Sequence, residues 1–191
     1  MNKIKYYSIL AFLIINSCFA GEQFSVELGV SYYPNSTFWT PCMPFKLKNI
    51  GNYLGITTKL YNKDNFISEL TITYGLHLTQ KQSTSSFYSD YSNNPQQYYF
   101  ATNQIYLGYK FNISKVVTLI AKGGFGTMFE QLETASVFCS GFESSPLISY
   151  STTLKHKITN LLYGIQISNE YLLPLHNIED CHFKMGLILF I

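Results

Sequence analysis

The chain has 191 residues, of which 47% are hydrophobic, 17% aromatic and 13% charged. All thirteen basic residues are lysine; setting aside a 20-residue leader that carries two of them leaves eleven lysines against eleven acids, a formal charge of zero. Neutrality and the absence of arginine argue against nucleic acids or anionic surfaces as partners. A mean hydropathy of +0.05 also excludes a helical membrane protein, whereas the charged fraction is about half that of ordinary soluble domains.

The first twenty residues are typical of a signal peptide. Two lysines precede an apolar stretch from 6 to 15, which is shorter than the roughly 20 residues of a spanning helix. Small residues at Cys18 and Ala20 predict cleavage into a leader, 1–20, and one domain, 21–191. A lipoprotein signal with acylated Cys18 is the alternative. The expected route is general secretion.

Beyond the leader, the chain alternates between apolar and polar residues. Phe24, Val26 and Leu28 share one face, while Ser25 and Glu27 share the other, and a period of two predicts a strand. No apolar run is long enough for a spanning helix, so a membrane form must be a closed barrel, which satisfies all backbone hydrogen bonds. We predict an all-β, closed antiparallel barrel of eight strands, over 23–33, 50–61, 66–79, 98–111, 116–129, 147–156, 159–172 and 184–191.

The connections between these strands differ in length. Tight turns are expected at 62–65, 112–115 and 155–157, and long polar loops at 34–49, 80–97 and 130–146. Alternation of brief turns and long loops is typical of an outer-membrane barrel, whose long loops lie outside the cell. Pro174 could mark a different turn, which would change the strand count near the C-terminus.

The charged residues of the strands all fall on the polar, glycine-containing face. A charge that faces the bilayer midplane costs about 2–4 kcal/mol, so we expect this face to line the lumen and the apolar face to touch lipid. The hairpin around 63–65 predicts that Lys59 lies opposite Glu69. An interior filled by ion pairs is favoured over a conducting pore. The expected lumenal charge network consists of Glu27, Lys59, Glu69, Lys110, Lys122 and Lys184.

Several aromatic residues lie near the predicted strand ends, where girdles form at lipid–water boundaries. A carbohydrate-binding patch is the alternative. The girdle candidates are Tyr53, Tyr61, Tyr74, Tyr98, Tyr99, Tyr109 and Phe111.

Three cysteines follow the leader: Cys42, Cys139 and Cys181. All three are expected at the extracellular end, in an oxidising setting. One disulfide is possible; Cys139 with Cys181 is our choice, although sequence does not determine connectivity. Their spacing shows no zinc-type ligand motif, so we expect no metal and no cofactor.

One group of residues has the composition of a catalytic site. His77 and Thr79 point the same way on one strand, and Ser83, Ser85 and Ser86 follow in the next loop. Some outer-membrane barrels that deacylate or transfer lipid chains use a histidine beside a hydroxyl nucleophile. Glu69 lies eight residues before His77, roughly 26 Å along the strand, too far to orient the ring. A polar rim histidine is therefore the favoured interpretation. His156, His176 and His182 are dispersed and show no ligand spacing.

The signal peptide and three short motifs resemble small opacity-type outer-membrane proteins, relatives of the membrane domain of outer-membrane protein A. The motifs are Glu27-Leu28-Gly29-Val30, Tyr106-Leu107-Gly108-Tyr109-Lys110-Phe111 and Lys122-Gly123-Gly124-Phe125-Gly126. The resemblance implies a non-enzymatic surface protein with roles in adhesion, envelope integrity or host contact. Phe190 is penultimate here, whereas that group usually ends on Phe or Trp, which bears on assembly.

These observations lead to four hypotheses. The first is a monomeric outer-membrane barrel, in contact with membrane lipid, whose long loops meet surface or host ligands. The others are a lipid A or phospholipid-modifying enzyme, a soluble periplasmic binding barrel and a small porin.

Overall fold

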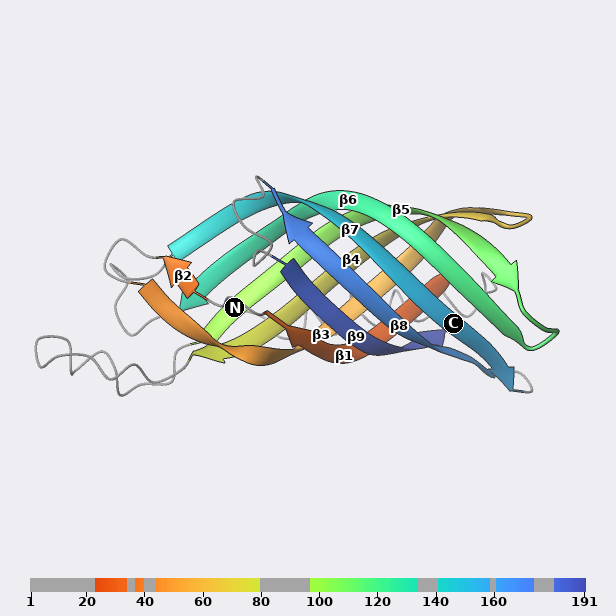
Figure 1. Cartoon of the computed structure of the whole chain (residues 1–191), viewed down its shortest axis with the longest axis horizontal. Coiled ribbons are helices and arrows are strands. Elements are labelled where there is room, and N and C mark those ends of the chain that lie inside the picture. Colours follow the sequence, from red (N-terminus) through yellow and green to blue (C-terminus); the bar gives the residue numbers. More distant parts are fainter. Residues whose placement is uncertain are drawn as a thin grey trace, which may run out of the picture.

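The structure, a computed structural model, describes residues 23–33, 37–39, 44–79, 97–133, 141–158, 161–173 and 181–191. Their strands form a single antiparallel sheet that closes on itself. The first strand pairs with β3 on one side and with β9 on the other, so this barrel has no open seam between its first and last strands. Figure 1 shows the strands tilted around the long axis of the barrel.

Eight of the nine strands within the described residues build the barrel, which confirms the predicted fold class. The ninth, β2, pairs only with the beginning of β3. The strands are β1 Phe24–Tyr32, β2 Thr37–Trp39, β3 Pro44–Lys63, β4 Phe66–Thr79, β5 Gln97–Asn112, β6 Val117–Glu133, β7 Gly141–Ile158, β8 Leu161–Leu172 and β9 Cys181–Phe190.

Several predicted boundaries were wrong because strand pairing continues beyond the apolar segments. The expected loop 34–49 contains β2 and the start of β3, and the expected loop 130–146 is mostly strand, since Phe129 pairs with Ser144. The expected turn at 155–157 is also strand, because β7 runs to Ile158. Polar residues at these positions indicated loops, but a ladder needs only backbone groups to propagate.

The two ends of the barrel differ. At one end, the turn end, Asp64 and Asn65 join β3 to β4, and residues 113–116 join β5 to β6. Asp64 adopts a φ of 54°, the left-handed conformation that aspartate tolerates in turns. The opposite end, the loop end, contains the end of β4 and the beginning of β5. Residues 80–96, which connect them, lie outside the described part.

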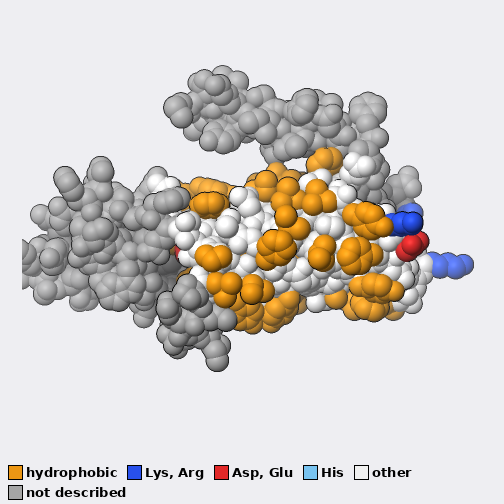
Figure 2. All heavy atoms as spheres, turned by 90° about the horizontal axis from the view of Figure 1, so that it is seen from above, with side chains coloured by type: hydrophobic (Ala, Val, Ile, Leu, Met, Phe, Trp, Pro, Cys, Tyr) orange, Lys and Arg blue, Asp and Glu red, His pale blue; other side chains and the backbone are white. Residues whose placement is uncertain are grey.

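The wall of the barrel is apolar outside and polar inside. On β9, Met185 is 45% exposed whereas its neighbour Lys184 is 4% exposed. The same alternation holds along β5, where Leu107 faces outward and Tyr106 inward. Figure 2 shows apolar side chains spread over the visible wall, with lysine and acidic side chains at the turn end. In the described ranges no helix is long and apolar enough to cross a membrane.

Candidate functional site

The interior of the barrel brings together side chains from most of its strands. Four of the six residues assigned to the lumenal charge network are almost completely buried: Glu27 (4% exposed), Glu69 (3%), Lys122 (8%) and Lys184 (4%). The other two, Lys59 and Lys110, are half-buried near the turn end. The lumen therefore contains charged side chains that are almost completely shielded from solvent.

A first chain of contacts runs across the half of the lumen nearer the turn end. The ammonium of Lys122 lies 2.9 Å from Oε2 of Glu69 and donates to Oε1 of Gln166 at 2.9 Å. The Gln166 amide donates to Oε2 of Glu27 at 2.8 Å, and the Tyr53 hydroxyl donates to Oε1 of Glu27 at 2.5 Å. Charge-assisted hydrogen bonds of this kind make burial of the two carboxylates tolerable.

The register of the β3–β4 hairpin places Lys59 directly opposite Glu69. This is the pairing that the tight turn at 63–65 predicts. The same carboxylate also receives Lys122 from β6, two strands away around the wall. Period-two reasoning along one hairpin could not identify that partner, because β6 reaches Glu69 only through curvature of the sheet.

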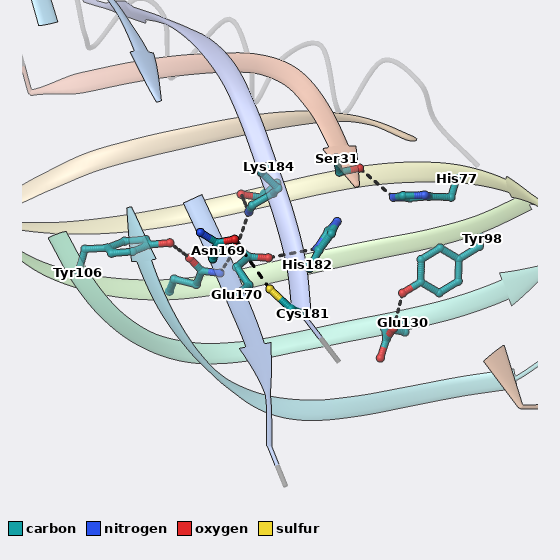
Figure 3. Close-up of polar contacts among 12 residues, drawn as sticks. Ser31, His77, Tyr98, Tyr106, Glu130, Asn169, Glu170, Cys181, His182 and Lys184 are labelled. Atoms are coloured by element: carbon teal, nitrogen blue, oxygen red, sulfur yellow. Dashed lines mark hydrogen bonds and ion pairs between the residues drawn. The ribbon is translucent and has the colours of Figure 1, made fainter. Parts of the chain in front are cut away.

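A second group centres on Glu170, which is 0% exposed. The carboxylate forms an ion pair with Lys184 and accepts from Nε2 of Gln104 at 2.5 Å. Nδ1 of His182 lies 3.2 Å from its other oxygen, and the Tyr106 hydroxyl donates to Gln104. Figure 3 shows these side chains converging from β5, β8 and β9. The group ties three strands together through polar contacts.

Histidines and aromatic rings fill the lumen toward the loop end. Nε2 of His77 lies 2.8 Å from the Ser31 hydroxyl, and the rings of His77 and His182 are 5.9 Å apart. The His182 ring meets Phe100 edge-on at 4.6 Å. Nearby, the Tyr98 hydroxyl donates to Glu130, as Figure 3 shows. These rings pack against one another inside the barrel toward the loop end.

His77 therefore lies inside the barrel, 1% exposed, and not at an open rim. The side chain of Thr79 and residues Ser83, Ser85 and Ser86 lie outside the described part. Among the described residues, the hydroxyl group beside the His77 ring belongs to Ser31, which is also 1% exposed. No cluster of three or more metal-binding side chains occurs among the described residues.

The assignment to the girdle was wrong for two of the aromatic residues. Tyr53 and Tyr98 are 4% and 1% exposed and point into the lumen, where each hydrogen-bonds a glutamate. Both lie at inward-facing positions of their strands. The girdle prediction considered only how near a residue lies to the strand end, and not which face of the strand it occupies. Tyr99 is half-buried, and the remaining candidates point outward: Tyr61, Tyr74, Tyr109 and Phe111.

The cysteine pairing stays a prediction. Cys139 and Cys42 lie outside the described residues. Cys181 begins β9 at the loop end, and its Sγ lies 3.8 Å from Oδ1 of Asn169.

Several buried polar residues escaped the sequence analysis. Glu130 was assigned to a loop, although it continues the inward phase of Lys122 along β6. His182 likewise continues the phase of Lys184, and Glu170 that of Gln166. Extending the period of two beyond the predicted strands would have found Glu130 and His182, whereas Glu170 already lies inside the predicted strand 159–172.

Comparison with known proteins places this fold. No protein-family model matches the chain, and no curated protein matches its sequence. Among solved structures, Neisserial surface protein A has a TM-score of 0.54 at 9% identity, with 88% of this chain and 97% of that one covered. Ail of Yersinia pestis, in complex with the heparin analogue sucrose octasulfate, scores 0.49 at 15% identity, covering 87% and 96%. The N-terminal β-barrel domain of Pseudomonas aeruginosa OprF scores 0.45 at 13% identity, covering 88% and 96%.

The class of protein follows from these observations. The chain folds as an eight-stranded antiparallel β-barrel of the type found in bacterial outer-membrane proteins. Because the sequence identities are low, the likeness concerns the fold and not an activity.

Proposed function

We propose that the chain is an exported outer-membrane protein of Gram-negative bacteria, monomeric in the bilayer, whose loop end contacts the surroundings or a host. One observation carries the proposal: aliphatic side chains face outward along the wall while Glu27, Glu69, Lys122 and Lys184 are buried inside. A soluble barrel would bury its aliphatic face and hydrate its charges. The segregation found here suits a lipid surround.

The location of binding follows from the contrast between the two barrel ends. Packed rings and ion pairs occupy the lumen, so the interior supplies a rigid scaffold and not a passage. Connections at the turn end are brief, whereas residues 80–96 form a long connection at the loop end. Long segments on a rigid scaffold are where recognition normally resides. Contact with the environment or with a host, or a role in envelope integrity, is therefore assigned to the loop end.

Migration in detergent gels tests the barrel assignment. The purified protein should run at a different position before and after boiling, because a closed barrel resists dodecyl sulfate at room temperature. Envelope fractionation of the native organism should place it with outer-membrane markers. A single boiled and unboiled position, with recovery in the soluble periplasmic fraction, would support the soluble binding barrel.

A loop deletion tests the surface role. A non-adherent bacterial host would express the full protein or a variant lacking residues 82–95, and adhesion to cultured epithelial cells would be counted. We expect the deletion to abolish any gain in adhesion while heat-modifiable migration stays unchanged. Detergent sensitivity of a strain lacking the gene measures the contribution to envelope integrity. No change in either property would contradict the proposed role.

The lipid-modifying enzyme has weaker support. His77 faces Ser31 inside the wall, away from the acyl chains that such an enzyme must reach. Mass spectrometry of lipid A from cells with and without the gene should show identical profiles. A changed profile would revive the enzyme hypothesis.

For the small porin, recordings in planar bilayers should show no conductance steps, since packed side chains occupy the lumen.

A further inference from the structure

A pocket of about 170 Å³ opens at the turn end of the lumen, on the side away from the loops. It lies beyond Glu69, where β3, β5, β6 and β7 approach their turns. Most of the side chains at its mouth are half-buried or exposed, so the pocket is accessible to solvent. Its lining consists of Lys59, Asn62, Ile67, Glu69, Lys110, Asn112, Thr118, Ile120, Lys155 and Phe190.

The side-chain charge of this pocket is positive. Among the described residues that line it are three lysines and one carboxylate, Glu69, which also binds Lys122 at 2.9 Å. Lys59 and Lys155 come from opposite parts of the wall, yet their ammonium groups lie 5.9 Å and 4.6 Å from the centroid of the same Phe190 ring. Three ammonium groups around one small pocket give it a positive potential, which favours the binding of an anion.

The neutral polar groups of the pocket also suit an anion. Oδ1 of Asn62 accepts from Nζ of Lys110 at 2.7 Å, and Oδ1 of Asn112 accepts from the Thr118 hydroxyl at 3.1 Å. Because both amide oxygens already accept a hydrogen bond, the NH₂ group of each amide is the part that can serve as a donor to an anion. The pocket thus combines ammonium and amide donors from three strands, β3, β5 and β7.

The rim around the pocket has the same sign. Segments 59–66, 109–118 and 154–158 contain six lysines against one acid, Asp64. The neutral total charge of the domain, which argued against anionic partners, conceals this uneven distribution. A basic rim concentrates anions near the mouth before they bind.

We propose that the pocket at the turn end binds a phosphate group. Lysine ammonium groups bind phosphate as point charges, and a phosphate group has the negative charge and the several acceptor oxygens to engage more than one ammonium at once. The phosphate could belong to a phospholipid headgroup of the inner leaflet or to a free periplasmic phosphate. The pocket lies at the end opposite the loops, so the proposal does not depend on what the loops bind.

Titration with inorganic phosphate tests the site. The full protein, folded in uncharged dodecyl maltoside micelles, would be titrated with phosphate against chloride at equal ionic strength and followed by NMR. We expect saturable shifts at the side-chain amides of Asn62 and Asn112. The double variant Lys59→Gln/Lys155→Gln should bind about tenfold more weakly or worse, because two charged donors are lost.

Lys115→Gln/Lys157→Gln is the matched control, since it removes the same two charges from exposed positions that do not line the pocket. Its affinity should stay within about twofold of the wild type. Non-saturating shifts, or equal weakening in the control and the double variant, would overturn the proposal. Heat-modifiable migration verifies that each variant folds. If the double variant fails to fold, Lys110→Gln replaces it, with a smaller weakening that still exceeds that of the control, because one charged donor is lost.

Nanodiscs distinguish the two sources of phosphate. The protein would be compared in phosphatidylcholine discs with and without phosphatidylglycerol. If the headgroup occupies the pocket, phosphatidylglycerol alone should shift the same amides and reduce the response to inorganic phosphate. An unaltered response assigns the pocket to free phosphate. Saturable binding in neither micelles nor nanodiscs would exclude both.

Discussion

Glu170 on β8 binds partners from β5 and β9 in the lumen, so its substitution should cause a large loss of stability. Glu170→Gln would leave the ammonium of Lys184, 4% exposed, without its carboxylate. Breaking a buried ion pair from one side costs about 3–5 kcal/mol, because the remaining charge is stranded. Urea unfolding in detergent micelles, followed by circular dichroism, should show this loss of unfolding free energy.

Asp64→Asn is the matched control for Glu170→Gln, since it removes the same charge in the exposed β3–β4 turn. Asparagine accepts the positive φ at this position, so stability should change by less than about 0.5 kcal/mol. Equal effects of the two variants would show that Glu170 does not act as an ion-pair partner.

Tyr53 demonstrates how an aromatic residue can serve the interior and not the lipid boundary. Its hydroxyl donates to Glu27 at 2.5 Å in a buried setting. Tyr53→Phe should lower the unfolding free energy by about 1–3 kcal/mol, because a buried carboxylate loses a donor. Tyr61→Phe, on an outward-facing ring that is 48% exposed, should be close to neutral in the same assay. A neutral Tyr53→Phe would contradict the lumenal assignment.

At the scale of elements, β4 and β5 are joined by a close approach of a ring to a glycine. Gly75 lies opposite Phe100 in the register, and a Cβ at Gly75 would come within 2.1 Å of the Phe100 ring. The ring cannot move aside freely, since it is 1% exposed and packs against His182. Gly75→Val should therefore destabilise the barrel by about 1–3 kcal/mol through overpacking.

Gly123→Val provides the comparison, because a Cβ at Gly123 meets nothing within 4 Å. Valine favours strands, so this variant should be neutral or slightly stabilising. Adding Phe100→Ala to Gly75→Val should recover part of the loss, measured by the same urea titration. Equal losses of unfolding free energy in Gly75→Val and Gly123→Val would mean that the Phe100 ring is not the reason why position 75 requires glycine.

The strands themselves were largely predictable from period two, and their limits were not. The cores of β1, β3, β4, β5 and β6 were all predicted, because one face of each is apolar and the other polar. In the extensions of β6 and β7 toward the loop end, polar residues interrupt the alternation of apolar and polar positions. Backbone hydrogen bonds continue there without any hydrophobic pattern to mark them.

At the scale of the whole molecule, the lipid belt predicts unequal effects at two equally exposed positions. Leu187 is 66% exposed on the wall and Ile113 is 63% exposed in the β5–β6 turn. Leu187→Lys should cost about 2–4 kcal/mol in a bilayer, because the charge would face acyl chains. Ile113→Lys should cost less than about 1 kcal/mol, since the turn meets water or headgroups.

Folding equilibria in phosphatidylcholine vesicles measure both variants. If the two lysines prove equally harmless, the outward aliphatic face does not touch lipid, and the outer-membrane proposal fails with it. If Leu187→Lys is harmful in vesicles and harmless in detergent micelles, the hydrocarbon environment itself is the cause.

The lumenal site was predictable in part. Alternation placed Glu27, Glu69, Lys122 and Lys184 on the polar face, and the structure buries all four. It could not say that Lys122 would reach Glu69, or that Gln166 would bridge Lys122 to Glu27. Those contacts join strands that are not neighbours along the hairpins. Closure of the sheet brings them together, and no local pattern records closure.

The sequence by itself determined the class of fold and the orientation of each strand face. It could do so because a period of two, the separation of charge from aliphatic side chains and the length of each connection are local properties. Only the tertiary structure decided which charges pair, that Tyr53 and Tyr98 serve the lumen, and that lysines from opposite walls share a pocket beside Phe190. The reason is geometric: curling the sheet into a cylinder brings inward side chains within bonding distance across the barrel axis.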